Sequence, residues 1–307
     1  MNVNKAVAAE KREKKTAAEN TPDAVLGVKI TNADREIFRD VHVTKGELAA
    51  YYAAVGPLML KQMKRHPISL LRCPGGADKS CFFQRNPDDY MKKHVKPYKL
   101  KHGGENHEYL YVEDAKAIVF LAQMGVIEIH PWNETVDKIK NPTAMIFDLD
   151  PADDVPFDAV KLAAQDVRKR LKKLGLESFV KCTGGKGLHV TVPLAGKDSW
   201  EKAYAFSQDF AKSLAAEVPD AYIATMSKAK RKGKIFIDYL RNNYTSSAIA
   251  DYSVRARQGA PVAVPLEWRE LGKLKAGNAF SMEDVLKRLK AGKCVKDDRY
   301  QLKQSLP

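Results

Sequence analysis

The chain has 307 residues, of which 44% are hydrophobic, and its 52 lysine and arginine residues outnumber 38 aspartate and glutamate residues, giving a net charge of +14. This length and hydrophobic content exclude a largely disordered chain and allow one large domain or two closely joined ones. The longest apolar stretch, residues 117–129, is interrupted by Gln123, Gly125 and Glu128, so no membrane-spanning helix is expected. The polar N-terminus contains no apolar core of a signal peptide, so we expect a cytoplasmic protein.

Basic residues are clustered in three segments, 92–101, 168–173 and 228–234. Such clusters are common on solvated faces, but three in one chain indicate a polyanionic partner. Nucleic acid is favoured over acidic lipid, because no basic amphipathic segment stands outside the predicted fold. Residues 1–22 mix alanine with charge and have no apolar period, so we interpret them as a flexible basic tail.

The four cysteines, Cys73, Cys81, Cys182 and Cys294, form no C-x-x-C pair. This spacing argues against a zinc ribbon, and four cysteines are too sparse for a disulfide framework. We therefore expect reduced thiols.

In chain order, residues 26–39 are expected to form a short strand, a turn over 31–34 and a helical stub. Thr44 and Glu47 have the spacing of a capping box, and apolar residues follow at helical intervals, which predicts a long helix beginning at Lys45. Strands are expected at 68–72 and 81–85, joined as a hairpin. A helix from about 114 to 125 and a strand over 126–130 follow.

The second half alternates strands and helices more clearly. Amphipathic helices are expected at 157–174 and 199–217, and strands at 143–150, 178–182, 188–194, from 222, at 234–240 and at 252–255. This order predicts an α/β or α+β fold in which helices cover a mixed sheet.

Asp148 and Asp150 end an apolar strand, and the two-residue period of a strand places both carboxylates on one face. A divalent cation would relieve their repulsion. The alternative, a strand end that turns into a loop, is preferred only for Asp153 and Asp154. A two-metal site for phosphoryl transfer needs a third carboxylate, and Asp238, in another apolar strand, is the best candidate.

The loop TGGKG at residues 183–187 lies between two predicted strands and is followed by His189. Its glycines would let backbone N–H groups approach a phosphate, while Thr183 adds a hydroxyl and Lys186 adds a charge. A tight hairpin would also explain the glycines, and the spacing is not that of a P-loop. His189 is either a core histidine or a hydrogen-bond donor to a triphosphate.

Arg241, Arg255 and Arg257 carry planar guanidinium groups suited to phosphate oxygens. Alternation places Arg255 and Arg257 on one face of the predicted strand, so both would reach one ligand, although a surface position stays open for at least one. Phe82 and Phe83 are flanked by basic residues, so one would stack on a base while the other packs inward, unless both are core residues.

Four motifs, in this order and spacing, closely resemble the polymerase domain of bacterial DNA ligase D: DLDP at 148–151, TGGKGLH at 183–189, DYLRN at 238–242 and YSVR at 252–255. The resemblance runs from about residue 27 to about residue 271. That domain belongs to the archaeo-eukaryotic primase superfamily and serves in non-homologous end joining. The resemblance implies a primase-type fold with mixed sheets, comprising an N-terminal α/β part (23–140), a catalytic part like an RNA-recognition motif (141–270) and a C-terminal helical segment (271–300).

The resemblance also implies roles for individual residues. Two catalytic divalent metals, with Mn²⁺ favoured and Mg²⁺ as the alternative, would be bound by Asp148, Asp150 and Asp238. The incoming nucleotide would contact Thr183, Lys186, His189, Arg241, Ser253 and Arg255. The 5′-phosphate of a downstream DNA strand would be bound by Arg35 and Lys45, and template bases would stack on Phe82 and Phe83.

The function implied is a template-directed nucleotidyltransferase that fills gaps and extends 3′ ends at DNA double-strand breaks and prefers ribonucleotides. Its partners would be DNA ends, gapped duplex with a 5′-phosphate, nucleoside triphosphates, Ku and a DNA ligase domain or protein, in the bacterial cytoplasm and at the nucleoid when bound to DNA. One alternative is a metal-dependent phosphate-ester or sugar transferase, which leaves Asp238 and the arginines unexplained. The other is a non-catalytic module that binds DNA ends.

Overall fold

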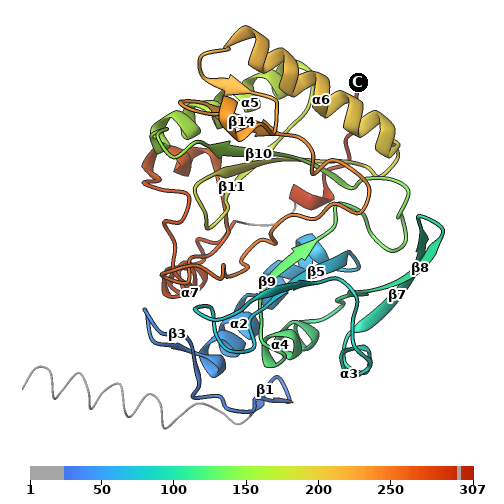
Figure 1. Cartoon of the computed structure of the whole chain (residues 1–307), viewed down its shortest axis with the longest axis vertical. Helices are drawn as coiled ribbons and strands as arrows, with labels where there is room; N and C mark the ends of the chain where they lie inside the picture. Colours follow the sequence, from blue (N-terminus) through green and yellow to red (C-terminus); the bar gives the residue numbers. More distant parts are fainter. Residues whose placement is uncertain (1–23, 296–298) are drawn as a thin grey trace, which may run out of the picture.

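The computed structural model describes residues 24–295 and 299–307 of the chain, so the tail predicted over residues 1–22 lies outside the described residues. Two sheets organise the described chain, one built between residues 67 and 131 and the other between residues 144 and 266. They form the lower and upper halves of Figure 1.

Two short strand pairs precede the first long helix. Strands β1 (Ala24–Val25) and β2 (Val28–Lys29) form a hairpin, and β3 (Glu36–Phe38) pairs with β4 (Val43–Thr44). The expected turn over residues 31–34 is present, but the helical stub predicted after it is wrong. Ile37 and Phe38 are buried from a strand instead, because the backbone there finds its partners on β4.

Helix α2 (Lys45–Met63) begins at the predicted residue. The Thr44 hydroxyl accepts a hydrogen bond from the Glu47 backbone N–H, and the Glu47 carboxylate accepts one from the Thr44 N–H. This is the predicted capping box, so two backbone donors at the helix start are satisfied locally. The helix packs against α4 (Ala115–Gln123).

The lower sheet has the order β6-β5-β8-β7, and β9 pairs with the other edge of β5. Its elements are β5 (Pro67–Arg72), β6 (Phe82–Gln84), α3 (Asp89–Lys92), β7 (Lys96–His102), β8 (Glu105–Tyr111) and β9 (Val126–Pro131). The predicted β5–β6 hairpin and the predicted strand β9 are confirmed. The β7–β8 hairpin, which carries lysines of the 92–101 cluster, is not predicted from the sequence.

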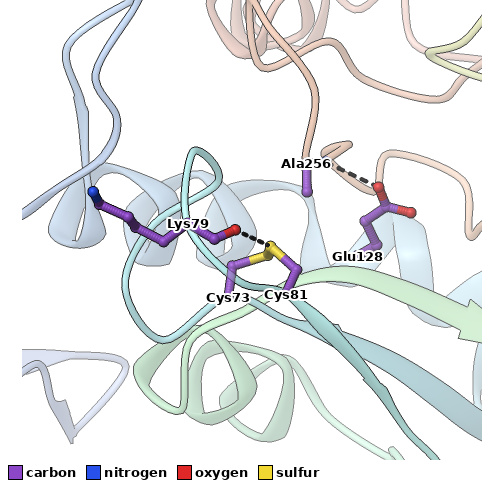
Figure 2. The surroundings of a disulfide bond; sticks show 5 residues. All are labelled: Cys73, Lys79, Cys81, Glu128 and Ala256. Carbon is purple, nitrogen blue, oxygen red and sulfur yellow. Dashed lines mark hydrogen bonds between the residues drawn. A yellow bond between two sulfur atoms is a disulfide. The ribbon is translucent and has the colours of Figure 1, made fainter.

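A disulfide joins Cys73 to Cys81, so the expectation of reduced thiols is wrong for this pair (Figure 2). The pairing of β5 with β6 explains it. Arg72 lies opposite Phe82 in the antiparallel register, so the next residue on one strand and the preceding residue on the other also face each other, with Cα atoms 4.3 Å apart. Cys182 and Cys294 are free thiols, as expected.

The upper sheet has the order β13-β14-β10-β12-β11-β15, in which β13 and β14 are parallel and the other pairs antiparallel. Its strands are β10 (Ala144–Pro151), β11 (Phe179–Cys182), β12 (Leu188–Pro193), β13 (Tyr222–Ile223), β14 (Ile235–Asp238) and β15 (Val264–Leu266). Helices α5 (Phe157–Lys173) and α6 (Trp200–Glu217) pack against this sheet. Helices on a mixed sheet are the predicted α/β architecture, which is confirmed.

The strand predicted over residues 252–255 is wrong. Tyr252 has a backbone φ of 62°, in the left-handed region, which interrupts an extended segment. The backbone is held by separate hydrogen bonds, from the Tyr252 N–H to the Ala263 carbonyl at 2.7 Å and from the Val254 N–H to the Tyr52 hydroxyl at 3.2 Å. This irregular path turns the following residues back toward the loop at 183–187.

The remaining elements are helix α7 (Met282–Lys290), which lies in the segment predicted to be helical, and short 3-10 turns at Lys228–Lys230, Trp268–Lys273 and Arg299–Gln301. The basic cluster at 168–173 extends along the end of α5, on the helical side of the upper sheet. None of the helices in the described part of the chain is long and apolar enough to cross a membrane.

Candidate active site

Three carboxylates share one face of the upper sheet. Phe147 of β10 packs against Phe210 of α6, so side-chain alternation turns Asp148 and Asp150 to the face away from the helices. Asp148 lies directly opposite Asp238 of β14 in the antiparallel register. Side chains of directly opposed residues point to the same face, so the structure brings the three predicted aspartates together.

Two arginines and a histidine contact these carboxylates. Asp148 Oδ2 lies 3.1 Å from Arg241 Nε and 3.4 Å from His189 Nε2. Asp150 Oδ2 lies 3.0 Å from Arg231 Nη1. Arg231 belongs to the basic segment 228–234, and its contact with Asp150 is not predicted from the sequence.

The electrostatics of the cluster favour a cation. Burial raises the pKa values of Asp150 and Asp238, and the negative charge of Asp148 raises both further. Burial also opposes the ionisation of Asp148, but His189 and Arg241 outweigh it and hold its pKa well below the usual range. A set of carboxylate oxygens of this kind suits Mg²⁺ or Mn²⁺.

The carboxylates do not converge on one point in this conformation. Across residues 24–295 and 299–307, no group of three or more His, Cys, Asp or Glu side chains forms a metal-binding cluster. The two arginines engage Asp148 and Asp150, and Asp238 Oδ1 accepts the Leu240 N–H at 2.8 Å. The residues fit a hard divalent cation by chemistry, and binding one would require these side chains to exchange partners.

Asn242 fixes the position of Arg241 and was not predicted as a site residue. Its Oδ1 accepts the Ile146 N–H at 2.7 Å, and its Nδ2 donates to the Ile146 carbonyl at 2.8 Å. Because β14 ends at Asp238, this amide takes the place of a strand residue beside β10. The buried amide thereby holds the chain that carries Arg241 next to Asp148.

The loop at residues 183–187, here called the glycine loop, connects β11 to β12. The Thr183 hydroxyl donates to the Gly187 carbonyl at 3.1 Å and accepts the Gly185 N–H at 3.2 Å, so it closes the loop. Lys186 forms an exposed ion pair with Asp153. A Cβ added at Gly187 would lie 2.3 Å from the Leu149 carbonyl oxygen, so a side chain there would push β10 away from the loop.

His189 lies on β12 directly opposite Asp148, and its side chain is almost fully buried. Burial lowers its pKa, against the opposing effect of Asp148. Its Nδ1 is buried and has no hydrogen-bond partner among the described residues. This unpartnered ring nitrogen lies beside the carboxylates and the glycine loop, and because it is buried, neighbouring groups would have to move before it contacts a ligand.

Arg255 and Arg257 both approach the glycine loop. Arg255 Nη1 donates to the Thr183 carbonyl at 2.8 Å, and a Cβ added at Gly185 would lie 3.4 Å from Arg257 Nη1. Ser253 is fully buried, and its hydroxyl accepts the Ile129 N–H at 3.0 Å. The predicted contact of Ser253 with a nucleotide stays a prediction, because the hydroxyl faces the protein interior in this conformation.

Arg35 and Lys45 lie together at the start of α2. The Lys45 N–H donates to the Arg35 carbonyl at 2.9 Å, and the Lys45 ammonium donates to the Thr31 carbonyl at 2.9 Å. Burial and the charge of Arg35 lower the pKa of Lys45 to about 8. Two neighbouring cations beside the first turn of a helix form an electrostatic environment that favours an anion.

Phe82 and Phe83 are both exposed, at 46% and 64%, so the expectation that one of them packs inward is wrong. The Arg72 guanidinium lies 5.6 Å from the centre of the Phe82 ring, and the Phe83 ring meets the His130 ring edge-on at 5.4 Å. Two exposed aromatic side chains on a short strand form a surface on which bases can stack.

Two further residues of this region, Glu128 and His130, were not predicted. They are two residues apart on β9 and therefore share one face of the strand, and His130 Nε2 lies 2.9 Å from Glu128 Oε2. The signal in the sequence is the pattern VIEIHP, in which two polar residues at a spacing of two interrupt an apolar strand.

Comparison with known proteins agrees with this arrangement. The sequence profile of the LigD primase-polymerase domain matches residues 44–295. The chain belongs to this family. It is 34% identical over 276 residues to the multifunctional non-homologous end joining protein LigD of Pseudomonas aeruginosa, covering 90% of this chain and 33% of that protein.

Other LigD relatives are similar. The chain is 27% identical over 281 residues to the bifunctional non-homologous end joining protein LigD of Bacillus subtilis, covering 91% of this chain and 45% of that protein. The polymerase domain of Mycobacterium tuberculosis ligase D, solved in complex with DNA, superposes with a TM-score of 0.83 at 27% identity and covers 90% of this chain and 99% of that one. The LigD-type primase-polymerase fold predicted from the motifs is thereby confirmed, while the chain spans less than half the length of these two curated relatives.

Proposed function

We propose that the protein is a template-directed nucleotidyltransferase that fills gaps and extends 3′ ends at DNA double-strand breaks during non-homologous end joining. The observation that carries the proposal is the direct opposition of Asp148 and Asp238, with Asp150 on the same face. His189, on the neighbouring strand, has a buried ring nitrogen with no hydrogen-bond partner among the described residues. Carboxylates beside a set of phosphate-binding donors are the requirements of phosphoryl transfer.

Asp148, Asp150 and Asp238 would hold two divalent cations, Mn²⁺ by preference or Mg²⁺, which when bound supply charge stabilisation at the α-phosphate and favour the ionised form of a primer 3′-hydroxyl. Two arginines of the chain would change partners when the metals bind. Arg241 and Arg231 would release Asp148 and Asp150, to which they are bound here. Once released, Arg241 would be free to donate to the oxygens of the bound nucleotide.

The triphosphate would lie along the glycine loop, with the pyrophosphate as leaving group. His189 would donate from its ring, and the guanidinium of Arg255, 2.8 Å from the Thr183 carbonyl, would contact the phosphates. Lys186 and the Thr183 hydroxyl would exchange their present partners, Asp153 and the Gly187 carbonyl, for phosphate oxygens. Ser253 would act by supporting the Arg255 segment or, after a local shift, by direct contact.

The DNA would contact the lower half. Arg35 and Lys45 would bind the 5′-phosphate of the downstream strand, and Phe82 and Phe83 would stack on template bases. We further propose a preference for ribonucleotides and cooperation with Ku and a DNA ligase domain or protein, in the bacterial cytoplasm. These last points rest on membership of the family.

A nucleotide-incorporation assay tests the proposal. The substrate is a gapped duplex with a 5′-phosphate, supplied with one matched nucleotide and with Mn²⁺, Mg²⁺ or EDTA. Templated, metal-dependent addition at the 3′ end is the expected result. Tight binding of the duplex without addition under any metal condition would favour a non-catalytic DNA-end-binding module. Release of phosphate or transfer of a sugar without templated addition would favour the metal-dependent transferase.

A further inference from the structure

We infer that Glu128 is a positioning residue for the nucleotide site, whose buried carboxylate holds Arg255 against the glycine loop. This inference rests on the proposed function, because the role of Arg255 in nucleotide binding is itself a proposal. Glu128 belongs to β9 in the lower sheet, whereas Arg255 follows the upper-sheet strand β14 in the chain. The contact between them therefore joins the two halves of the molecule at the proposed site.

The Glu128 carboxylate has one ion-pair partner, Arg255, and two hydrogen-bond partners, His130 and the Ala256 N–H. Oε2 lies 3.1 Å from Arg255 Nε and 2.9 Å from His130 Nε2. Oε1 accepts the Ala256 N–H at 2.9 Å, and Figure 2 shows the carboxylate turned toward Ala256. One carboxylate thus fixes both the side chain of Arg255 and the backbone of the residue that follows it.

The guanidinium of Arg255 is held from two sides. Nε forms an ion pair with Glu128 but no hydrogen bond to it, and Nη1 donates to the Thr183 carbonyl at 2.8 Å. A side chain at Gly184 would be excluded, because its Cβ would lie 2.7 Å from Arg255 Cγ. Arg255 is therefore placed along the glycine loop in one orientation. Its remaining guanidinium nitrogen, Nη2, makes no hydrogen bond within the described residues. Nη2 can therefore contact a phosphate.

Burying a charged group at position 128 costs folding free energy, and a role in positioning Arg255 would explain why the charge is there. The Glu128 side chain is 5% exposed, and a buried ion pair contributes little net stability compared with an apolar pair of the same size. Its partners nevertheless keep it ionised: burial opposes the charge, but His130, Arg255 and the Ala256 N–H together lower its pKa to about 2. A fixed negative charge that orients an arginine reduces the entropy that the arginine loses when it binds phosphate.

The test compares two buried glutamates that are six residues apart in the sequence, Glu128 and Glu134. Glu128→Gln keeps the size of the side chain but removes the charge that orients Arg255. Glu134→Gln is the matched control, because Glu134 is fully buried, contacts the Thr245 N–H at 3.1 Å and has its pKa raised to about 8 by burial. Glu134 is therefore largely protonated at pH 7, and its amide replacement changes little. Both variants are also made in an Arg255→Ala background, and steady-state kinetics and Tm are measured for each full-length protein.

We expect Glu128→Gln to raise the nucleotide KM about tenfold, with kcat changed less than about twofold, and to add no further increase in the Arg255→Ala background. Equal effects of Glu128→Gln in both backgrounds, or a loss of kcat and Tm with KM unchanged, would overturn the inference. If Glu128→Gln fails to fold, Glu128→Asp, which keeps the charge but withdraws it by one methylene, is expected to raise KM selectively, and an unchanged KM would count against it. If Arg255→Ala alone leaves KM unchanged, Arg255 does not bind the nucleotide. The inference about Glu128 then fails because the proposed function of Arg255 is wrong, and not because Glu128 fails to position Arg255.

Discussion

Asp148 and Asp238 lie directly opposite each other on adjacent antiparallel strands, β10 and β14. Like charges at directly opposed positions destabilise a sheet. Arg241, three residues beyond Asp238, offsets part of this repulsion by its contact with Asp148 at 3.1 Å. The site therefore carries an electrostatic cost for folding that a bound cation would reduce.

The first prediction concerns the carboxylates. Asp150→Ala and Asp238→Asn should each lower nucleotide incorporation by about a hundredfold or more, because each removes a proposed metal ligand. The Tm of Asp238→Asn should not fall, since this substitution relieves repulsion with Asp148, whereas Asp150→Ala relieves repulsion but also removes the ion-pair partner of Arg231. Asp148→Ala should also abolish incorporation, but it leaves Arg241 without its carboxylate partner. Incorporation is measured on a gapped duplex, and stability by thermal unfolding.

Asp158→Ala is the control for these variants, because Asp158 is an exposed carboxylate on α5 that pairs with Lys161 on the helical side of the sheet. Its incorporation rate should equal that of the unmodified protein. Incorporation at the normal rate by Asp150→Ala or Asp238→Asn would remove that residue from the proposed metal site.

The second prediction concerns the pair Arg35 and Lys45. The double substitution to alanine should weaken binding of a gapped duplex with a 5′-phosphate about tenfold and scarcely change binding of the same duplex with a 5′-hydroxyl. Fluorescence anisotropy at fixed salt measures both affinities. Lys99→Ala, an exposed lysine of β7, is the control and should not alter the preference for the phosphate. Equal losses on both duplexes would mean that the pair contributes only general electrostatics.

The same pair predicts a pH dependence. The pKa of Lys45 is lowered to about 8, so the free protein loses this positive charge as the pH rises through that value. The preference for the 5′-phosphate over the 5′-hydroxyl should therefore be smaller at pH 9 than at pH 7. Lys45→Met should make the preference smaller at pH 7 and nearly independent of pH in this window. A preference that grows with pH would contradict the role of Lys45.

The third prediction concerns the exposed aromatics. Phe82→Ala and Phe83→Ala should weaken binding of a single-stranded template overhang by about 1–3 kcal/mol per stacked base. Tm should hardly change, because neither phenylalanine is buried. Leu162→Ala is the control: Leu162 is exposed to the same fraction, 64%, as Phe83 but lies on α5. Unchanged template affinity in both phenylalanine variants would exclude base stacking on this surface.

The fourth prediction is that ribonucleotides are better substrates than deoxyribonucleotides. It depends on the family alone. Steady-state kinetics with UTP and dTTP opposite a template adenine compare the two kcat/KM values directly. A higher value for dTTP would show that this chain departs from the expected preference.

The fifth prediction concerns the Cys73–Cys81 disulfide. Alkylation of the denatured, unreduced protein should modify two cysteines, Cys182 and Cys294, and reduction should raise the number to four. Closing the short loop between residues 73 and 81 should stabilise the fold by about 2 kcal/mol through the unfolded state. A thermal unfolding experiment should therefore give a lower Tm after reduction, and Cys73→Ser with Cys81→Ser should reproduce it without reductant. Four reactive thiols in the unreduced protein would contradict the disulfide.

Features that depend on a few neighbouring residues could be predicted from the sequence. The capping box of Thr44 and Glu47 determines where α2 begins, and the apolar run before Asp148 determines β10. The three aspartates could be selected because each lies in an otherwise apolar strand, where a charge needs a partner. Their register, with Asp148 opposite Asp238, depends on strand pairing and required the structure.

Features that depend on contacts between distant segments could not be predicted. The β7–β8 hairpin has few apolar residues and no strong alternation, because most of its surface is exposed. Tyr252 adopts a left-handed conformation that its residue type does not predict. The disulfide follows from the pairing of Arg72 with Phe82, which the spacing of the cysteines does not reveal. Glu128 acquires its partners only when the 255–256 segment folds over β9.

The amide of Asn242 determines where the chain leaves the upper sheet. The Asn242 side chain satisfies both backbone groups of Ile146 in place of a strand residue. The backbone can therefore leave β14 after Asp238. The chain is then free to cross to the lower half, where the Ala250 N–H donates to the Ile129 carbonyl, before it returns to the glycine loop at Arg255. One continuous stretch of polypeptide thus carries the Asp238 carboxylate and the guanidinium groups of Arg241 and Arg255, so a shift in this crossing would move all three groups of the proposed site at once.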